Sequence, residues 1–397
     1  QAEDGIRDRS PSRGLGDVYK RQGNVLFILS RVLPNIVHSM KEWAYTFGAV
    51  SKEQWIRQIE SDLKQKTIAS LQSEWWPGET LMPLLHRDDV TVETVSLPSA
   101  LFTQPPLIAE WISTSGQQAT AINQQILDAL QQDIPSLILH STDDSAWFDE
   151  EWFNGIFRDM ITVSYQIDDF SENTFRKLEK IRTKDLIRVN REASSLSLGK
   201  LLTATDPYAS NLGSLRFIYR IESSGIWDVN TAGVIDRMVE DLTDWTNLGF
   251  QPADFFQQCI LSLEADKAYF KHIIQTRVLH LLWYNLKAHL IQSSAEIPDH
   301  YLECHIYEST QESPEHFLIR ASMSGLAASL AGSHTVCIHH SSREETPDLY
   351  KRANRNIHHL LQLESAMYKG VDPMSGALSI DYYTRSWTQR IWNALRL

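Results

Sequence analysis

The 397-residue sequence is poor in the features on which many common sites depend. It has only three cysteines, Cys259, Cys304 and Cys337, and no CxxC pair. Widely separated cysteines favour buried thiols in a reducing cytoplasm over disulfides or a structural zinc site. GxSxG, HExxH and P-loop patterns are absent as well, so the sequence carries none of these hydrolase, zinc-protease or phosphate-loop signatures.

Long apolar runs and an excess of basic residues are also missing. The longest apolar stretch, Val25 to Val37, contains Arg31, Pro34 and Asn35, and is therefore not predicted to span a bilayer. The net charge of −13 argues against an extended nucleic-acid surface, because phosphate binding needs clustered Lys and Arg. The sequence predicts a cytoplasmic protein with no membrane and no nucleic acid as a partner, and leaves open a local basic pocket for one phosphorylated cofactor.

The first residues do not read as folded protein. Residues 1–22 have no apolar period and mix both charges with turn formers, which is typical of disordered chain. They resemble a translated sequencing adaptor, and Met40 is the expected true start. A signal peptide built on Arg21 and the run VLFIL is the alternative, but no clean small-x-small cleavage site follows. We therefore expect residues 1–39 to be artefactual and to contribute nothing to function.

Residues 40–100 are expected to form an arm for subunit contact. Apolar residues such as Trp55 and Ile59 recur at near-helical spacing and predict a helix over 51–69, with Ser51 placed to cap it. The following SEWWPGETLMPLLHRDDV is rich in proline, glycine and aromatic residues. Such a segment is typical of an arm that lies on another surface.

From about residue 105 short apolar runs alternate with longer amphipathic stretches. The predicted strands are 107–113, 136–141, 160–165, 215–221, 301–307 and 334–340. The predicted helices are 119–130, 148–157, 172–183, 231–246, 265–290 and 347–364. Alternation of this kind implies a parallel sheet with helical crossovers, and two more strands in 185–205 and 366–382 would complete eight. With no early Gly-rich phosphate loop, the pattern favours an α/β fold with a (β/α)₈ TIM barrel over 101–397.

Histidines cluster at His334, His339 and His340, and again at His358 and His359. A strand over the first group would place His339 on the face opposite the other two. Because no Asp or Glu stands at ligand spacing, we predict no metal site here, and packed or solvated histidines instead.

Two further patterns have a structural and a functional interpretation. The acidic runs Asp168-Asp169 and 149–151 could supply carboxylates, but acidic residues at loop and helix starts are more often caps. The small-residue run 323–332, MSGLAASLAG, predicts either a closely packed helix or a tight backbone beside a ligand, and composition favours close packing.

Four ordered motifs in the carboxyl-terminal third resemble the methylmalonyl-CoA mutase family. The residues that carry the resemblance are Arg277 and Trp283 of RVLHLLW, Arg320 and Gly332 of LIRASMSGLAASLAG, Arg352, Arg355 and Asn356 of RANRNIHHLLQLES, and then Asp372, Pro373 and Gly376. Ser375 stands in place of the first glycine of the family's Asp-Pro-x-Gly-Gly. The resemblance covers about residues 50–397, strongly after 225 and thinly between 100 and 210, and it implies structural roles for these motif residues.

The resemblance also implies a chemistry. Members of this family use adenosylcobalamin to interconvert methylmalonyl-CoA and succinyl-CoA by a radical route, in which the cofactor reacts and the protein positions the substrate. In the catalytic chain coenzyme A threads the barrel, and a separate flavodoxin-like domain holds the cobalamin through Asp-x-His-x-x-Gly. Several relatives are heterodimers of that chain and a degenerate one.

Three departures indicate the degenerate partner. No Asp-x-His-x-x-Gly occurs, and the sequence ends at Leu397, so no carboxyl-terminal flavodoxin-like cobalamin domain is expected. The catalytic chain has Tyr-His before Glu-Ala-Gly, where this sequence has Trp227 and Asp228 before Ala232-Gly233. A carboxylate cannot donate the hydrogen bond that the imidazole gives the migrating carbonyl. The family's Arg-Gln-Tyr-Ala-Gly and Thr-Ile-Gln-Asn-Asp segments have no counterpart.

The sequence thus predicts a non-catalytic small subunit that binds no cofactor itself, partnered by a large catalytic subunit that holds adenosylcobalamin. One alternative is an enzyme, namely a truncated acyl-CoA mutase chain that uses a separate cobalamin-binding protein. Another is an unrelated enzyme on the same scaffold, since fold does not fix function.

Overall fold

The computed structural model divides the chain into two units, Gln1–Gln72 and Ser73–Leu397, which are described separately below. The predicted arm, 40–100, runs across this division. The described residues are 50–64, 66–76, 79–82, 85–86, 88–90, 94–142, 148–168, 184–191, 198, 214–223, 226–291, 301–309, 311–339, 348–365 and 371–396.

The described part of the first unit is a capped helix followed by a short turn. Helix α2 (Lys52–Asp62) begins at Ser51, whose hydroxyl accepts a hydrogen bond from the Gln54 N–H while the Gln54 side chain accepts one from the Ser51 N–H. This reciprocal pair is a capping box. The helix predicted over 51–69 is therefore confirmed at its start. It ends early, and the 3₁₀ helix η1 (Ile68–Leu71) follows.

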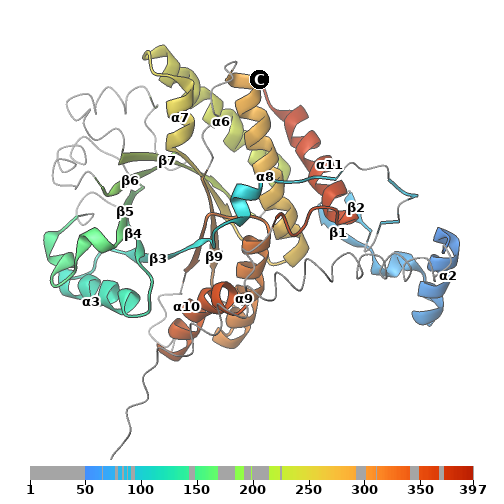
Figure 1. Cartoon of the computed structure of the whole chain (residues 1–397), viewed down its shortest axis with the longest axis horizontal. Helices are drawn as coiled ribbons and strands as arrows, with labels where there is room; N and C mark the ends of the chain where they lie inside the picture. The colour runs from blue at the N-terminus through green and yellow to red at the C-terminus, as the bar shows by residue number, and fades with distance from the viewer. Residues whose placement is uncertain are drawn as a thin grey trace, which may run out of the picture. The chain divides into compact units, whose positions relative to one another are not determined.

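The second unit is a closed barrel of eight parallel strands (Figure 1). In barrel order the strands are β10 (Thr335–His339), β3 (Leu107–Ser113), β4 (Ser136–Ser141), β5 (Thr162–Ile167), β6 (Leu186–Asn190), β7 (Leu215–Ile221), β8 (Cys259–Glu264) and β9 (Tyr301–Tyr307). Strand β10 pairs with both β3 and β9, which closes the ring. The predicted (β/α)₈ barrel is confirmed.

Two strand predictions need correction. No strand occurs in the described part of 366–382, residues 371–382, because helix α11 (Leu378–Ala394) begins there. The missing strand is β8, whose six residues are nearly all buried, so its sequence CILSLE lacks the alternation that marks a half-exposed strand. Strand β5 lies two residues later than predicted, since a 3₁₀ turn, η4 (Arg158–Met160), precedes it.

Helices surround the barrel on its outside (Figure 1). They are α3 (Ala119–Leu130), α6 (Trp227–Asn247), α7 (Pro252–Gln258), α8 (Tyr269–Leu290), α9 (Pro314–Leu330), α10 (Asp348–Leu363) and α11, and the other short elements are η2 (Ser99–Phe102), η3 (Glu150–Phe153) and the hairpin of β1 (Ser73–Trp76) with β2 (Glu79–Leu81). The helix predicted over 148–157 is reduced to η3, and Gly155 follows with a positive φ of 75°, which ends helical geometry. The helix predicted over 172–183 lies outside the described residues.

Most of α8 is buried, because α9 packs on one side of it and α11 on another. The small-residue run 323–332 lies largely in α9, where a side chain at Gly325 would meet the His358 ring of α10 at 3.4 Å. Close helix packing, the favoured interpretation of this run, is what the structure has.

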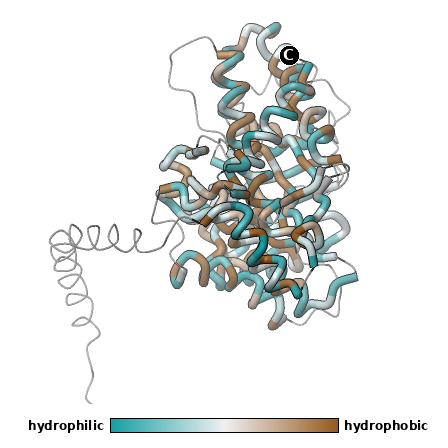
Figure 2. The backbone as a smooth tube through the Cα atoms, turned by 90° about the vertical axis from the view of Figure 1, so that its right-hand side faces the viewer, coloured by the Kyte–Doolittle hydropathy of each residue, from teal (hydrophilic) through white to brown (hydrophobic). Residues whose placement is uncertain are grey.

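Burial follows the two faces of each strand. Cys304 and Ile306 of β9 pack outward with Phe317 and Ile357 of the covering helices, whereas alternate residues of the strand point to the barrel axis. Along the helices the chain alternates between hydrophilic and hydrophobic positions, as expected of helices with one buried face (Figure 2). Among the described residues no helix has the length and apolar character needed to cross a bilayer.

Candidate functional site

A cavity of about 250 Å³ lies at the carboxyl ends of the barrel strands, the end at which barrel enzymes carry their active sites. Nearly every strand contributes a side chain to it. The lining residues are Trp111, His140, Gln166, Asp168, Asn190, Ile218, Arg220, Ser262, His305 and Tyr307.

Beside the cavity, β9 and β10 bring two histidines and a cysteine together. A nitrogen of His305, a nitrogen of His339 and the Cys337 sulfur all lie within 4.8 Å of one another. His305 Nδ1 is 2.7 Å from His339 Nε2. The His339 ring stacks on Tyr307, with ring centroids 4.1 Å apart, and contacts Trp111 at 4.8 Å. Aromatic rings thus hold the His339 imidazole in one orientation.

A buried ion pair lies directly beneath these histidines. Arg188 of β6 donates to both carboxylate oxygens of Glu303 in β9, at 2.7 and 2.5 Å, and to Gln166 at 3.2 Å. Burial alone would raise the pKa of the Glu303 carboxyl, but the Arg188 charge and hydrogen bonds from His305 and Arg188 outweigh it and lower that pKa to about 2. Glu303 is therefore an ionised acceptor at neutral pH.

The ionised Glu303 fixes the tautomer of His305. Glu303 Oε2 lies 3.1 Å from His305 Nε2, which must carry a proton to bond it. Burial lowers the pKa of His305, with Glu303 partly opposing that effect, so the ring is neutral. His305 Nδ1 consequently presents a lone pair to His339.

A histidine–aspartate pair, His140 and Asp168, faces the same cavity. His140 Nε2 of β4 lies 2.8 Å from Asp168 Oδ2, and Trp111 packs on the His140 ring at 4.7 Å. Burial would raise the pKa of Asp168, but the hydrogen bond and charge of His140 outweigh it, and the pKa lies below its ordinary value. Helix caps were the favoured interpretation of the two acidic runs. Asp149 is such a cap, because it accepts a hydrogen bond from the Glu151 N–H. For Asp168 the interpretation is wrong, because its carboxylate pairs with His140.

Sequence reasoning missed most of this site. It singled out His339 but not His305 or His140, because these come from strands that are distant in sequence and adjacent only in the barrel. The other two histidines of the predicted cluster are not part of this site as described. His334 accepts a hydrogen bond from the Leu302 N–H, and His340 lies outside the described residues. One sequence signal was available, since both β9 and β10 carry histidines near their carboxyl ends.

The structure brings two of the predicted motif residues together. Arg277 of α8 is fully buried, and its Nη1 donates to Asp372 Oδ1 at 2.7 Å while its Nη2 donates to the Val95 carbonyl at 2.8 Å. Asp372 also accepts from the Leu97 N–H at 2.9 Å. These bonds hold α8 against the segment before η2 and the turn before α11, so both motif residues have a structural role.

Other motif residues fasten helices or turns. Arg320 of α9 donates to Glu312 and to the Tyr307 carbonyl, and Arg355 of α10 binds both carboxylate oxygens of Glu110 on the outward face of β3. Trp283 of α8 is buried against Phe256, with ring centroids 5.3 Å apart.

The remaining motif positions are two glycines and three exposed residues. Gly332 and Gly376 have φ values of 86° and 85°, a region that favours glycine, and the Gly376 N–H donates to Asp381. The exposed residues are Arg352, Asn356 and Pro373.

The positions expected to be degenerate lie between helices. Trp227 is buried at the start of α6 with its ring centroid 6.1 Å from that of Trp387 in α11, and Asp228 pairs with Arg390 of α11 at 2.5 Å. None of the predicted site residues, from Trp227 to Gly376, is among the described residues that line the barrel cavity.

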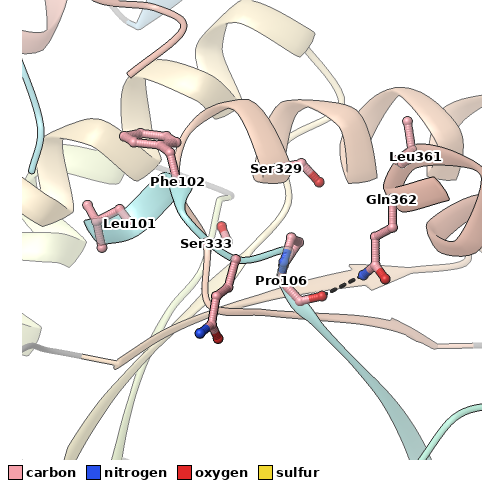
Figure 3. Close-up of a pocket in the computed structure, with 8 residues that line it drawn as sticks. Leu101, Phe102, Pro106, Ser329, Ser333, Leu361 and Gln362 are labelled. Atoms are coloured by element: carbon pink, nitrogen blue, oxygen red, sulfur yellow. Dashed lines mark hydrogen bonds between the residues drawn. The ribbon is translucent and has the colours of Figure 1, made fainter. Parts of the chain in front are cut away.

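A second pocket lies between η2, α9 and α10 (Figure 3). Gln362 of α10 closes one side by donating to the Pro106 carbonyl at 2.7 Å, and Ser329 and Ser333 line the pocket. Its volume of about 10 Å³ is close to that of a single water site. This pocket is too small for a ligand.

Comparison with known proteins adds one family. Residues 228–396 match the family model described as "Methylmalonyl-CoA mutase". The matched segment begins in α6 and contains β8, β9, β10 and all the motif residues from Arg277 to Gly376. Over this part of the barrel the chain is similar to that family. The comparison with curated proteins found no match.

Several solved barrel structures are distantly similar. A dihydropteroate synthase from Stenotrophomonas maltophilia is 10% identical over 66% of this chain and 94% of its own, with a TM-score of 0.35. A truncated 3-deoxy-D-arabino-heptulosonate 7-phosphate synthase from Thermotoga maritima is 9% identical over 66% and 88%, with a TM-score of 0.37. A 7,8-dihydropteroate synthase from Vibrio fischeri is 11% identical over 66% and 94%, with a TM-score of 0.37.

Proposed function

We propose that this chain is the small, non-catalytic subunit of a heterodimeric, adenosylcobalamin-dependent methylmalonyl-CoA mutase. The observation that carries the proposal is that a buried ion pair blocks the interior of the barrel, in a chain with a segment similar to the mutase family. Arg188 and Glu303 come from strands three positions apart around the ring of eight, and both side chains are at most 3% exposed. Their ion pair fills the space through which coenzyme A would have to pass.

The cost of breaking this ion pair supports a barrel interior that stays blocked. Separating a buried ion pair costs about 3–5 kcal/mol when one charge is left without its partner. The cavity above the pair, about 250 Å³, is also smaller than the range of about 300–1,000 Å³ typical of small-molecule sites. A pantetheine arm would need both the ion pair parted and the cavity enlarged.

The surroundings of Asp228 support the same proposal. Its carboxylate is bound to the Arg390 guanidinium, and its neighbour Trp227 is fully buried between α6 and α11. A carboxylate held in an ion pair accepts hydrogen bonds and does not donate them. The position that resembles the family's Tyr-His therefore cannot assist a migrating carbonyl as an imidazole would.

An amphipathic helix in the proposed arm suits contact with the large subunit. Trp55, Ile59 and Leu63 stand at four-residue intervals, and no residue of α2 is fully buried. Trp55, Ile59 and Leu63 are only partly buried, and a helix with such an apolar stripe gains stability when a partner buries it further. We therefore assign this helix, together with the Trp75-Trp76 pair, to contact with the catalytic chain.

Reconstitution tests the catalytic part of the proposal. The purified chain is assayed for methylmalonyl-CoA and succinyl-CoA interconversion with adenosylcobalamin, alone and with a catalytic chain that carries Tyr-His and Asp-x-His-x-x-Gly. We expect the isolated chain to be colourless and inactive, and the mixture to be active as a heterodimer. Turnover by the isolated chain, or by the chain with only a free-standing cobalamin-binding protein, overturns the proposal.

Variants of the arm test the assembly. We expect Trp55→Ala with Ile59→Ala, and separately Trp75→Ala with Trp76→Ala, to weaken co-elution with the catalytic chain in size-exclusion runs. Arg57→Ala with Gln58→Ala, on the exposed part of the same helix, is the matched control and should co-elute normally. Unchanged co-elution of both aromatic variants would remove the arm from the interface.

A further inference from the structure

We propose that His305, Cys337 and His339 form a binding site for a borderline-soft divalent cation such as Zn²⁺ at the mouth of the barrel. Two imidazoles and a thiolate are ligands that zinc prefers, whereas Mg²⁺ and Ca²⁺ prefer oxygen. The inference concerns binding by this chain alone and goes beyond the proposed subunit function.

The backbone places the three ligands together without distortion. Cys337 of β10 is the register partner of His305 in β9, and His339 follows Cys337 by two residues and so points to the same side of its strand. One donor atom from each residue lies within 4.8 Å of the others. Adjacent parallel strands thus supply three ligands from rigid elements.

The spacing of the two imidazole nitrogens is close to that of a tetrahedral zinc site. Zn–N bonds of about 2.0 Å and a Zn–S bond of about 2.3 Å put tetrahedral ligands about 3.3–3.6 Å apart. The two imidazole nitrogens, now 2.7 Å apart, would have to separate by about 0.6 Å. Small side-chain rotations accomplish this movement.

The groups around the ligands already have the arrangement of a metal site. His305 donates its Nε2–H to the Glu303 carboxylate, which Arg188 holds in turn by two hydrogen bonds. A carboxylate behind a ligating histidine fixes the tautomer and raises the basicity of the coordinating nitrogen. His339 is held between Tyr307 and Trp111, so its ring is oriented before any ion arrives.

The protons balance on binding. In the metal-free state His339 Nε2–H donates to the lone pair of His305 Nδ1. The cation takes both nitrogens, His339 moves its proton from Nε2 to Nδ1, and the Cys337 thiol releases one proton to solvent as its sulfur becomes a thiolate. His305 and Trp111 also line the 250 Å³ cavity, so the fourth position on the cation faces space that water can fill.

Cobalt substitution tests the site on the whole chain. The protein is stripped with a chelator, freed of it under anaerobic conditions and titrated with Co²⁺, while Zn²⁺ binding is followed by calorimetry. We expect one equivalent to bind, with thiolate-to-cobalt charge-transfer absorption and the intense visible bands of a tetrahedral ion. Absence of the charge-transfer absorption from the wild-type protein overturns the proposal.

Variants separate this site from the other thiols. Cys337→Ser should abolish the charge-transfer absorption, and Glu303→Gln should weaken Zn²⁺ binding about 10–100-fold through His305. Cys304→Ser is the matched control, because Cys304 is also buried and lies 3.2 Å from a histidine nitrogen, that of His272, but points to the outside of the barrel. Persistence of the absorption in Cys337→Ser, or its loss in Cys304→Ser, refutes the assignment.

A second ligand variant keeps the test decisive if Cys337→Ser does not fold. His339 is the last residue of its strand, and His339→Gln removes the imidazole while it keeps a polar side chain of similar length. We expect this variant to keep the near-ultraviolet circular dichroism of the metal-free protein and to lose stoichiometric Zn²⁺ binding. Unchanged binding by a folded His339→Gln variant contradicts the proposal.

Discussion

Replacing Arg277 with methionine should destabilise the barrel unit far more than breaking an exposed ion pair. The change leaves the Asp372 carboxylate buried without its cation, and the Val95 carbonyl loses its donor. Removing one partner of a buried pair costs about 3–5 kcal/mol. Asp372 still accepts hydrogen bonds from the Leu97 and Met374 N–H groups, which places the expected loss near the lower end of that range.

The loss can be measured by heat or urea. Unfolding entropy of about 2.1 cal/mol/K per residue over the barrel unit, Ser73–Leu397, means that each kcal/mol lowers the Tm by about 1.5 °C. We therefore expect the Arg277→Met variant to melt about 4–5 °C below the wild type. The urea midpoint should fall with an unchanged slope.

A matched variant isolates the effect of burial. Lys184 lies 3.7 Å from Asp159, and both side chains of this pair are largely exposed, at 76% and 69%. Exposed pairs contribute about 0.2–1 kcal/mol, so Lys184→Ala should lower the Tm by no more than about 1.5 °C. Equal shifts in the two variants would refute the argument that burial sets the cost.

Further expected outcomes concern two glycines and one buried histidine, His358. In urea titrations Gly332→Ala should destabilise the folded protein by about 1–2 kcal/mol, because φ at this position is 86° and the new Cβ would lie 3.3 Å from Leu101 and Phe102. Gly233 lies on α6 with open space around it, so Gly233→Ala should stabilise the protein by about 0.5–1 kcal/mol. Burial lowers the pKa of His358 to about 4, below the 6.5 expected when unfolded, so the unfolded chain binds the extra proton and stability falls as the pH drops from 6.5 towards 4. When the free energy of unfolding is measured in urea at several pH values in that range, its dependence on pH should be weaker in His358→Gln than in the wild type, by up to about 1.4 kcal/mol per pH unit. The same dependence in both proteins would mean that this histidine does not titrate on unfolding.

Strand and helix positions were predictable where the local pattern was strong. Strands β3, β4, β7 and β9 begin and end at the predicted residues, and α3 does so as well. The predictions failed where the pattern itself was ambiguous. Strand β8 is buried on both faces and loses its alternation, and Gly155 reduces the expected helix over 148–157 to a short turn.

The candidate site was largely beyond the sequence. His140, His305 and His339 come from three strands, and Arg188 and Glu303 come from two strands 115 residues apart in the chain. No local spacing relates residues that meet only when a barrel closes. Motif positions such as Arg277 and Asp372 were recognised from the sequence, but their pairing with each other was not.

The sequence by itself determined the alternation of strands and helices and the positions of the mutase-like motifs, because periodicity and turn chemistry act over a few neighbouring residues. The tertiary structure decided which side chains share the barrel interior, because closing eight strands sets residues from distant segments side by side. The ion pair of Arg188 with Glu303, and the meeting of His305, Cys337 and His339, follow from that closure. Both depend on strand register, which non-local hydrogen bonds between backbones fix.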